Sequence, residues 1–169
     1  GFGRGSNLGI RHALERTRSE YILLLNNDTY IRDNVVERLE QFLDSHREFA
    51  GCSSKIVFAD DPGRIWYGGG ELNWLRGGAI SWNIFKRDSG PGHPVEVTFI
   101  TGCVMMLRRS LLEEIGGFDP RYFIYVEDVE LCARIRKHGG RLAYLPSVIV
   151  YHRTHGSIRR EGSTYVEPQ

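Results

Sequence analysis

The 169-residue sequence has few cysteines, few lysines and no long apolar run. Its three cysteines (Cys52, Cys103 and Cys132) are widely spaced and form no C-x-x-C pair, so neither a disulfide scaffold nor a zinc knuckle is indicated. No apolar run reaches the roughly 18 residues of a membrane-spanning helix. No signal peptide is recognisable either. These absences favour a globular protein in a reducing compartment.

An excess of charge of one sign is also missing, because the formal net charge is only +1. A nearly neutral chain has no overall field that attracts nucleic acid or membranes, so we expect no nucleic-acid partner. Lysine occurs only at positions 55, 86 and 137, and arginine therefore carries most of the positive charge. The planar guanidinium suits phosphates, although a compositional bias of the genome explains the excess equally well.

The sequence does contain alternating strand-like and helical segments. The apolar run YILLL (21–25) is followed by polar NNDT, which is typical of a strand covered on both faces. Apolar residues then recur at helical spacing over 33–46 and again over about 127–138, where two glycines end the pattern. This alternation predicts one α/β domain with a mainly parallel sheet.

Local signals predict several boundaries. The segment 6–18 predicts a helix capped by Ser6 or Asn7, and SLLE (110–113) predicts a capping box at the start of a short helix. RLAYLP and SVIVYH, over 141–152, predict two short strands.

Residues 60–94 differ from the rest because they are rich in glycine and contain all three tryptophans. Their aromatic content argues against a disordered linker and predicts a long excursion or hairpin. Trp66, Trp74 and Trp82 suit stacking on sugars, but burial in a small satellite core is at least as good an interpretation.

The first candidate site follows YILLL. Asn26, Asn27 and Asp28 stand at the carboxyl end of a strand, where ligands bind in open α/β sheets. A carboxylate flanked by amides is an oxygen-rich set that suits Mg²⁺ or Mn²⁺. The same triplet is typical of a tight turn or a helix cap, and on these residues alone that interpretation is favoured.

The second candidate lies in FIYVEDVEL (123–131), where acids follow aromatics at a helix start. Asp128 suits a helix cap, with Glu130 favoured by the helix dipole. It equally suits a general base, provided that an acceptor hydroxyl reaches it. Capping accounts less well for the whole acidic run, which includes Glu127, so both interpretations stay open.

The third candidate is His152, at the end of SVIVYH. A histidine that leaves a strand is usually not a ligand, but beside Asp28 it would be a plausible nitrogen ligand for the same metal. His155, Arg159 and Arg160 suit either a diphosphate pocket or a solvated basic tail, and the tail is favoured on these residues alone.

A fourth candidate is Gly102, in the strand-like run TGCVMML. A glycine in a strand pattern marks either a bulge or a close approach of the backbone to a ligand. The rest of this run is typical of a core strand.

In order, the chain contains GFGRGSNLGI, ILLLNNDT, TGCVMMLRRSLLEEIGGFDPRYFIYVEDVELCARIRKHG and VIVYH. Together these motifs resemble the family 2 glycosyltransferases, especially the rhamnosyltransferase-like and polysaccharide-assembly members, over residues 1 to about 156. The resemblance implies a GT-A fold and inverting transfer from a nucleotide-diphospho-sugar to a saccharide or lipid-linked acceptor. The sequence departs from the family pattern at Asn26 and Asn27, which replace acids, and at Glu130, which is often Asp.

Carried over to this sequence, the resemblance implies that Asp128 is the catalytic base and that Asp28 and His152 bind Mg²⁺ or Mn²⁺. Residues 60–94 would lie on the acceptor side, and residues 157–169 would form a tail. The other expected contacts with the donor or the sugars are Arg4, Asn7, Asn27, Gly102, Cys103 and Glu127.

Two other classes stay open: a metal-dependent nucleotidyltransferase, and a noncatalytic sugar-binding module on the same fold. The expected location is the cytoplasm, at the inner face of the membrane if the acceptor is lipid-linked. Peripheral membrane association is therefore also left open.

The family places a β-α-β-α-β stretch before GFGRGSN, whereas this chain opens inside that motif. We therefore expect the C-terminal part of a GT-A domain, with N-terminal strands missing. One edge of strand 21–25 should then be open, covered by rearrangement or taken by another chain, which would allow self-association. Such a piece alone should bind donor weakly and turn over little.

Overall fold

The computed structural model describes residues 1–75, 77–122 and 126–153. Its helices are α1 (Phe2–Arg16), α2 (Val35–Ser45), α3 (Arg109–Ile115) and α4 (Glu127–Lys137). Its strands are β1 (Tyr21–Leu25), β2 (Thr29–Tyr30), β3 (Phe49–Phe58), β4 (Ile65–Tyr67), β5 (Gly70–Asn73), β6 (Gly78–Ser81), β7 (Val95–Val97), β8 (Val104–Arg108) and β9 (Arg141–His152). Within these residues, no helix combines the length and apolar character needed to cross a bilayer.

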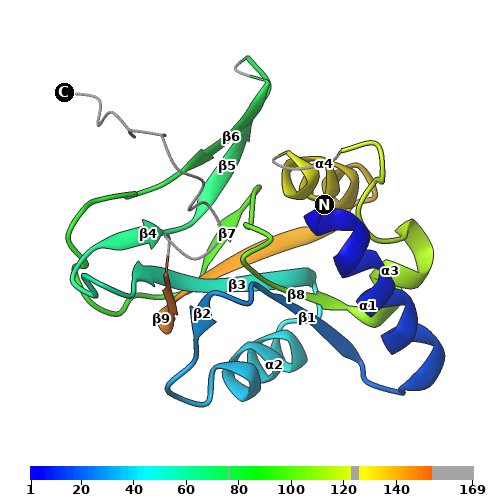
Figure 1. Ribbon diagram of the computed structural model, residues 1–169, viewed down its shortest axis with the longest axis horizontal. Coiled ribbons are helices and arrows are strands. Elements are labelled where there is room, and N and C mark those ends of the chain that lie inside the picture. Colours follow the sequence, from blue (N-terminus) through cyan, green and yellow to red (C-terminus); the bar gives the residue numbers. More distant parts are fainter. Residues whose placement is uncertain (76, 123–125, 154–169) are drawn as a thin grey trace.

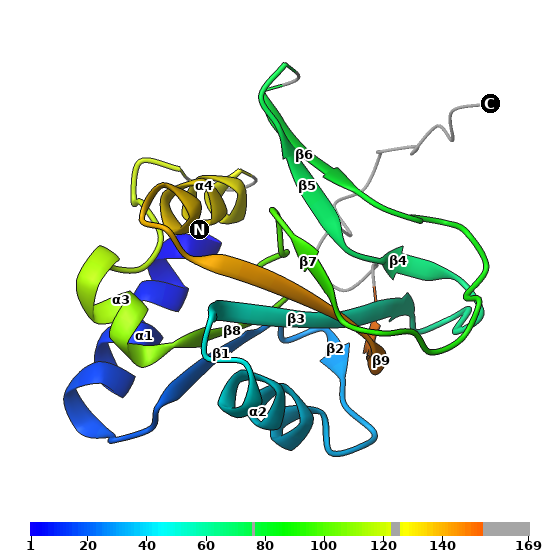
Figure 2. The same ribbon diagram turned by 180° about the vertical axis from the view of Figure 1, so that it is seen from behind.

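One mixed sheet forms the centre of the molecule, with strand order β1-β8-β3-β9-β2. β4 adds to β3, β7 adds to β9, and β5 and β6 form a separate hairpin. In Figures 1 and 2, α2 lies on one side of this sheet, while α4 and the hairpin lie on the other. The predicted α/β class is confirmed.

The prediction of a mainly parallel sheet is wrong. Among the described strands, only β3 and β9 pair in parallel, and the remaining pairs are antiparallel. The strands of the insert follow one another without crossover helices, and the chain returns through β7 and β8 in reversed directions. Parallel neighbours need a crossover connection, which this part of the chain does not supply.

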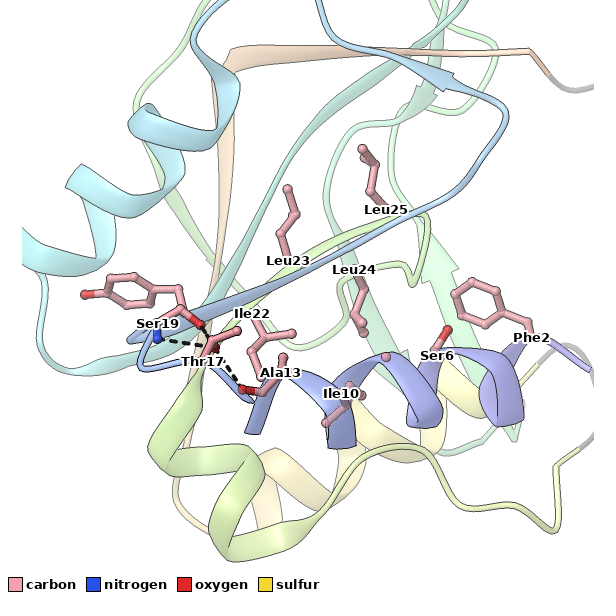
Figure 3. Close-up of a pocket in the computed structure, with 12 residues that line it drawn as sticks. Phe2, Ser6, Ile10, Ala13, Thr17, Ser19, Ile22, Leu23, Leu24 and Leu25 are labelled. Atoms are coloured by element: carbon pink, nitrogen blue, oxygen red, sulfur yellow. Dashed lines mark hydrogen bonds between the residues drawn. The ribbon is translucent and has the colours of Figure 1, made fainter. Parts of the chain in front are cut away.

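β1 lies at one end of the sheet, and its only partner among the described strands is β8. The expectation of an open edge on strand 21–25 is therefore confirmed for these residues. Its side chains alternate between buried and half-buried, and Tyr21 and Leu23 still pack against the core, so the predicted covering of both faces is complete on one face and partial on the other. Burial alternates because Ile22 and Leu24 point toward α1, whereas Leu25 at the strand's end is exposed (Figure 3).

An apolar groove of about 410 Å³ runs between α1 and β1 along this open edge (Figure 3). Phe2, Ile10 and Ala13 line it from the helix. An unpaired strand edge beside an apolar groove presents both backbone groups and apolar surface to a further strand. Self-association through this edge stays a prediction.

α1 starts earlier than the sequence signals predicted, and Asn7 makes a long-range contact instead of capping it. The helix begins at Phe2, after Gly1, so neither Ser6 nor Asn7 caps it. The Asn7 amide instead donates to the Phe118 carbonyl at 2.7 Å and accepts from the Phe118 N–H at 2.8 Å. This double hydrogen bond ties α1 to the turn that follows α3.

Two other boundaries differ from the predictions. α3 begins after Arg108 with no side-chain cap hydrogen bond, so the SLLE capping box does not form, although the helix itself and its glycine end at Gly116 are confirmed. β9 is one strand rather than two, because a register shift against β3 absorbs the segment around Pro146. A bulge is one of the few places where a sheet tolerates proline.

The expected excursion over 60–94 is confirmed as three strands with connecting loops. Lys55 of β3, only 2% exposed, donates to an Asp88 carboxylate oxygen at 2.5 Å and to the Gly90 carbonyl at 2.6 Å. A buried ammonium has to be paired, so this contact fixes the end of the insert to the sheet.

Candidate active site

Asp28 and His152 are brought together by the shortest strand of the sheet. β2 pairs with the end of β9, and Thr29 lies opposite His152 in that register. The Arg153 N–H also donates to the Asp28 carbonyl at 2.8 Å. The turn before β2 is therefore held against the last residues of β9, although 124 positions separate the two side chains.

The side chains of Asp28 and His152 meet directly. The His152 Nε2 lies 3.1 Å from the Asp28 Oδ1, so their predicted convergence is confirmed. Trp66 of β4 packs its ring edge-on against the imidazole, with 4.4 Å between ring centroids. Burial lowers the pKa of His152, against the opposing effect of the Asp28 charge. Burial therefore favours the neutral form of the imidazole, which is the form that binds metals.

Asp128 lies in the first turn of α4, as expected. The residue before the helix, Val126, has φ +82°, a conformation in which a β-branched residue is strained. Val126 is the N-cap, so the interpretation of Asp128 as the cap is wrong. The Asp128 carboxylate accepts the Gly102 N–H at 3.0 Å and the Val129 N–H at 2.9 Å.

Burial is the largest influence on Asp128 and raises its pKa, while the backbone hydrogen bonds and the Thr101 side chain lower it. Asp128 makes no ion pair with a described cation. A half-buried carboxylate without an ion-pair partner and with a raised pKa is a stronger proton acceptor than a fully solvated one. These properties suit a general base.

Cys103 connects the two carboxylates. Burial raises the pKa of its thiol, and the negative charges of Asp28 and Asp128 raise it further. Its carbonyl also accepts the Asn26 N–H at 3.0 Å, which holds the NND turn against the segment that contacts Asp128. Both acids therefore lie within electrostatic reach of one buried side chain, at one site.

Gly102 lies close to α1 and α4. A Cβ added there would lie 3.0 Å from the Phe2 ring and 3.6 Å from the Asp128 Cβ. The tight contact is therefore with Phe2 of α1, while the distance to Asp128 of α4 is an ordinary van der Waals contact. That the backbone approaches a ligand at Gly102 stays a prediction.

Glu127 is buried beside Asp128, and its Oε2 has no hydrogen-bond partner among the described residues. Burial raises its pKa, and the neighbouring Asp128 charge raises it further. An unpaired buried carboxyl oxygen is costly, which is consistent with a site that a ligand completes.

Asn7 has both amide groups engaged with Phe118, while Arg4 and Asn27 are exposed. Their expected contacts with the donor stay predictions. The aromatics at 123 and 125, together with His155, Arg159 and Arg160, lie outside the described residues, as does the tail at 157–169.

The residues present fit a divalent cation that keeps most of its own waters. Within the described residues there is no cluster of three or more His, Cys, Asp or Glu side chains that would enclose a metal. Asp28 and His152 supply one oxygen and one nitrogen that already face each other. Mg²⁺ typically uses one or two carboxylates plus substrate phosphates and water, so two protein ligands suffice.

Two contributors were missed in the sequence. Trp66 was considered only for sugar stacking or a satellite core, and no sequence signal pairs it with His152 across 86 positions. Thr101, whose side chain hydrogen-bonds Asp128, lies directly before Gly102. Its position next to that candidate residue could have identified it from the sequence.

Comparison with known proteins gives a consistent result. The model of the family described as "Glycosyltransferase like family 2" matches residues 2–161. Rhamnosyltransferase WbbL of Escherichia coli K12 is 27% identical over 94% of this chain and 63% of its own length. The N-acetylglucosaminyl-diphospho-decaprenol L-rhamnosyltransferase of Mycobacterium tuberculosis H37Rv is 40% identical over 68 residues, which are 40% of this chain and 22% of that protein. The chain thus spans less than two thirds of these relatives.

Among solved structures, GalNAc-T7 with UDP, GalNAc and Mn²⁺ superposes with a TM-score of 0.67 at 18% identity, covering 92% of this chain and 31% of that one. A197 from STIV gives a TM-score of 0.58 at 15% identity, over 90% of this chain and 67% of that one. These likenesses concern the fold, which is of the GT-A type. Together with the match over residues 2–161, they lead to one conclusion: the chain belongs to glycosyltransferase family 2, with rhamnosyltransferase-like relatives.

Proposed function

We propose that this chain carries the metal-binding and base-bearing part of an inverting glycosyltransferase. Its substrates would be a nucleotide-diphospho-sugar donor and a saccharide or lipid-linked acceptor. The observation that carries the proposal is that two adjacent residues contact both acidic segments: the Gly102 N–H donates to Asp128, and the Cys103 carbonyl accepts the Asn26 N–H, two residues before the Asp28 that faces His152.

Asp128 takes the proton from the acceptor hydroxyl. That hydroxyl becomes acidic only as its oxygen bonds to the anomeric carbon, so a carboxylate is a sufficient base, worth about 10²–10⁴-fold in rate. The Gly102 and Val129 N–H groups hold the carboxylate in one orientation. A single base of this kind suits direct displacement, in which the acceptor attacks opposite the leaving group and the configuration inverts.

Asp28 and His152 are the residues that would hold Mg²⁺ or Mn²⁺. When bound, such an ion neutralises the charge that develops on the departing diphosphate. Burial lowers the pKa of His152, which favours the neutral imidazole that ligation needs. Trp66 limits rotation of the imidazole by packing against it.

The acceptor class rests on the relatives. One is named for transfer to N-acetylglucosaminyl-diphospho-decaprenol, a lipid-linked saccharide. By extension, we propose a lipid-linked acceptor for this chain, with the reaction at the inner face of the cell membrane. No observation at the site favours the two alternative functions, a nucleotidyltransferase and a noncatalytic sugar-binding module.

The test is a binding and turnover screen of nucleotide-diphospho-sugars with Mg²⁺, Mn²⁺ or chelator. The expected result is donor binding that requires metal and is weakened in His152→Asn. His138→Asn, at a surface histidine that faces Glu114, is the matched control and should bind like the parent. Metal-independent binding, or equal loss in both variants, would contradict the proposed site.

A further inference from the structure

The β5–β6 hairpin ends in the most exposed apolar residues of the structure. Among the described large hydrophobic side chains, Leu75 is 100% exposed and Trp74 is 73% exposed, the two highest values, and the two are neighbours. Single exposed apolar residues are ordinary on protein surfaces. Two adjacent ones at the end of a projecting hairpin (Figures 1 and 2) are a concentrated apolar tip.

The tip is formed by a closed turn. Asn73 pairs with Gly78 at the end of the ladder, and the Gly77 N–H donates to the Trp74 carbonyl at 3.3 Å. Gly77 has φ +62°, a conformation that favours glycine. The turn therefore keeps Trp74 and Leu75 outside the hairpin ladder instead of folding them back onto the core.

The base of the hairpin is attached to the segment that carries the candidate site. The Leu72 N–H donates to the Thr98 hydroxyl at 2.7 Å, and the Thr98 N–H donates to the Gly70 carbonyl at 3.2 Å. Thr98 lies four residues before Gly102, whose N–H binds Asp128. Trp74 follows Leu72 by two residues, so the tip extends about 7 Å beyond the last of these hydrogen bonds at ~3.3 Å per residue.

Other apolar residues of the insert are packed, which distinguishes them from the tip. Trp82 lies against Gly69, where an added Cβ would come within 2.9 Å of its ring, and Trp66 lies against His152. Leu72 packs on the core from β5. The tip therefore lies apart from the hydrophobic core, against which the other two tryptophans pack.

We infer that Trp74 and Leu75 insert into the interfacial region of a lipid bilayer and dock the acceptor side of the site on the membrane. This inference rests on the proposed lipid-linked acceptor, whose sugar would lie at the membrane surface. Tryptophan is enriched at membrane interfaces because its ring is apolar while its N–H can still bond to headgroups or water. The adjacent leucine adds apolar area that only an apolar phase can cover.

Charge does not carry this docking. The segment 70–81 carries one acid and one base in its sequence, Glu71 and Arg76, so its formal charge is zero. Binding should therefore occur on uncharged phosphatidylcholine vesicles and should not depend on anionic lipid. That expectation separates insertion of the tip from electrostatic adsorption of an arginine-rich surface.

The test is co-sedimentation of the purified protein with phosphatidylcholine vesicles, without donor or metal. Replacing Trp74→Ser and Leu75→Ser together should weaken partitioning about tenfold or more, given the apolar area removed. Leu8→Ser, at a 65% exposed leucine of α1, is the matched control and should partition like the parent. The Trp emission should shift to the blue on vesicle addition, and Trp74→Phe should abolish that shift while largely keeping binding.

Several results would overturn the inference: no partitioning of the parent protein, equal partitioning of the double variant, or partitioning that requires anionic lipid. A change of oligomeric state in the double variant without lipid would assign the tip to a second copy instead. Loss of oligosaccharide binding with unchanged partitioning would assign Trp74 to sugar stacking. Because partitioning is measured without donor, failure of the proposed transfer reaction leaves this readout intact, and donor binding in solution tests that reaction separately.

Discussion

Asp28 and Asp128 are the same residue type at one site, but their surroundings differ. Asp28 follows β1 and faces an imidazole 3.1 Å away, in a pair that an ion can enter. Asp128 opens α4 and is held by the backbone N–H groups of Gly102 and Val129. Under the proposed function, this difference in environment makes Asp128 the expected proton acceptor and Asp28 the expected cation ligand.

The difference also concerns rigidity. The Asp128 contacts come from backbone groups of two separate elements, so its position is set by the fold. The Asp28 contact comes from a side chain, whose own orientation depends on packing by Trp66. The first arrangement favours precise proton transfer, and the second favours adaptable binding of a ligand.

The largest effect should follow from Asp128→Asn, which keeps the shape but removes the base. In an active parent enzyme that contains this segment, transfer should fall by about 10²–10⁴-fold with donor affinity nearly unchanged, because the base acts only in the transition state. The measurement is kcat/KM for transfer beside the donor Kd. Asp61→Asn, at an exposed carboxylate in the insert, is the control and should match the parent.

Two results would break the comparison at this point. An equal loss of donor binding would make Asp128 a structural or positioning residue. Full transfer activity would remove it from the chemistry altogether and favour a nucleotidyltransferase, which needs no carboxylate on the acceptor side.

Asp28→Asn should give the opposite pattern. It keeps an oxygen near His152 but removes the negative charge, so metal-dependent donor affinity should fall by about 10–100-fold, comparable to losses seen at other metal sites. Donor binding measured with chelator present should stay the same. Calorimetric titration with and without Mn²⁺ distinguishes the two, and a drop of equal size in chelator would show that Asp28 does not act through a metal.

The sequence predicted these two roles better than it predicted the sheet. The ends of apolar runs and the acidic start of a helix are local signals, and they placed Asp28, His152 and Asp128 correctly relative to their elements. The convergence of Asp28 and His152 could be predicted because each stands at the end of a strand-like apolar run. Their roles toward metal and acceptor stay predictions.

Long-range partners could not be predicted in the same way. Asn7 looked like a helix cap because caps are local, but its partner Phe118 lies 111 positions away. The direction of β8 depends on the path of the insert, which no local pattern encodes. The start of α4 was predicted, whereas the positive φ of Val126 was not, since β-branched residues rarely adopt it.

A smaller effect is expected on the pH dependence of the rate. The pH below which the rate falls should be shifted upward by the raised pKa of Asp128. Burial raises its pKa above the ordinary value of 3.8, and the rate falls as pH drops through that raised value because the base becomes protonated. Folding favours the protonated form, so the stability from this group is full below the unfolded pKa and is lost as pH rises through the folded pKa. Glu127 has the same sign.

Acidification should therefore lower kcat/KM, while protonation of these two carboxyls should not destabilise the folded protein. The measurement is kcat/KM and Tm across the same pH series. A limb at or below the ordinary aspartate value would show that the hydrogen bonds, rather than burial, dominate Asp128. A parallel fall of Tm would instead attribute the lost rate to unfolding.

The smallest effect should come from Trp66→Leu, which tests whether the Asp28 side of the site depends on packing. The smaller side chain no longer covers the imidazole, whose ring centroid now lies 4.4 Å from the indole centroid, so His152 gains rotational freedom. Metal-dependent donor affinity should fall by less than about tenfold, at or below the range for residues that orient metal ligands. Trp66→Phe should restore most of it, and Trp74→Leu, at the exposed tip, should leave it unchanged. A fall in Trp66→Leu of Tm, or of the donor binding that persists in chelator, would show that the tryptophan stabilises the insert as a whole and does not specifically orient His152 toward Asp28.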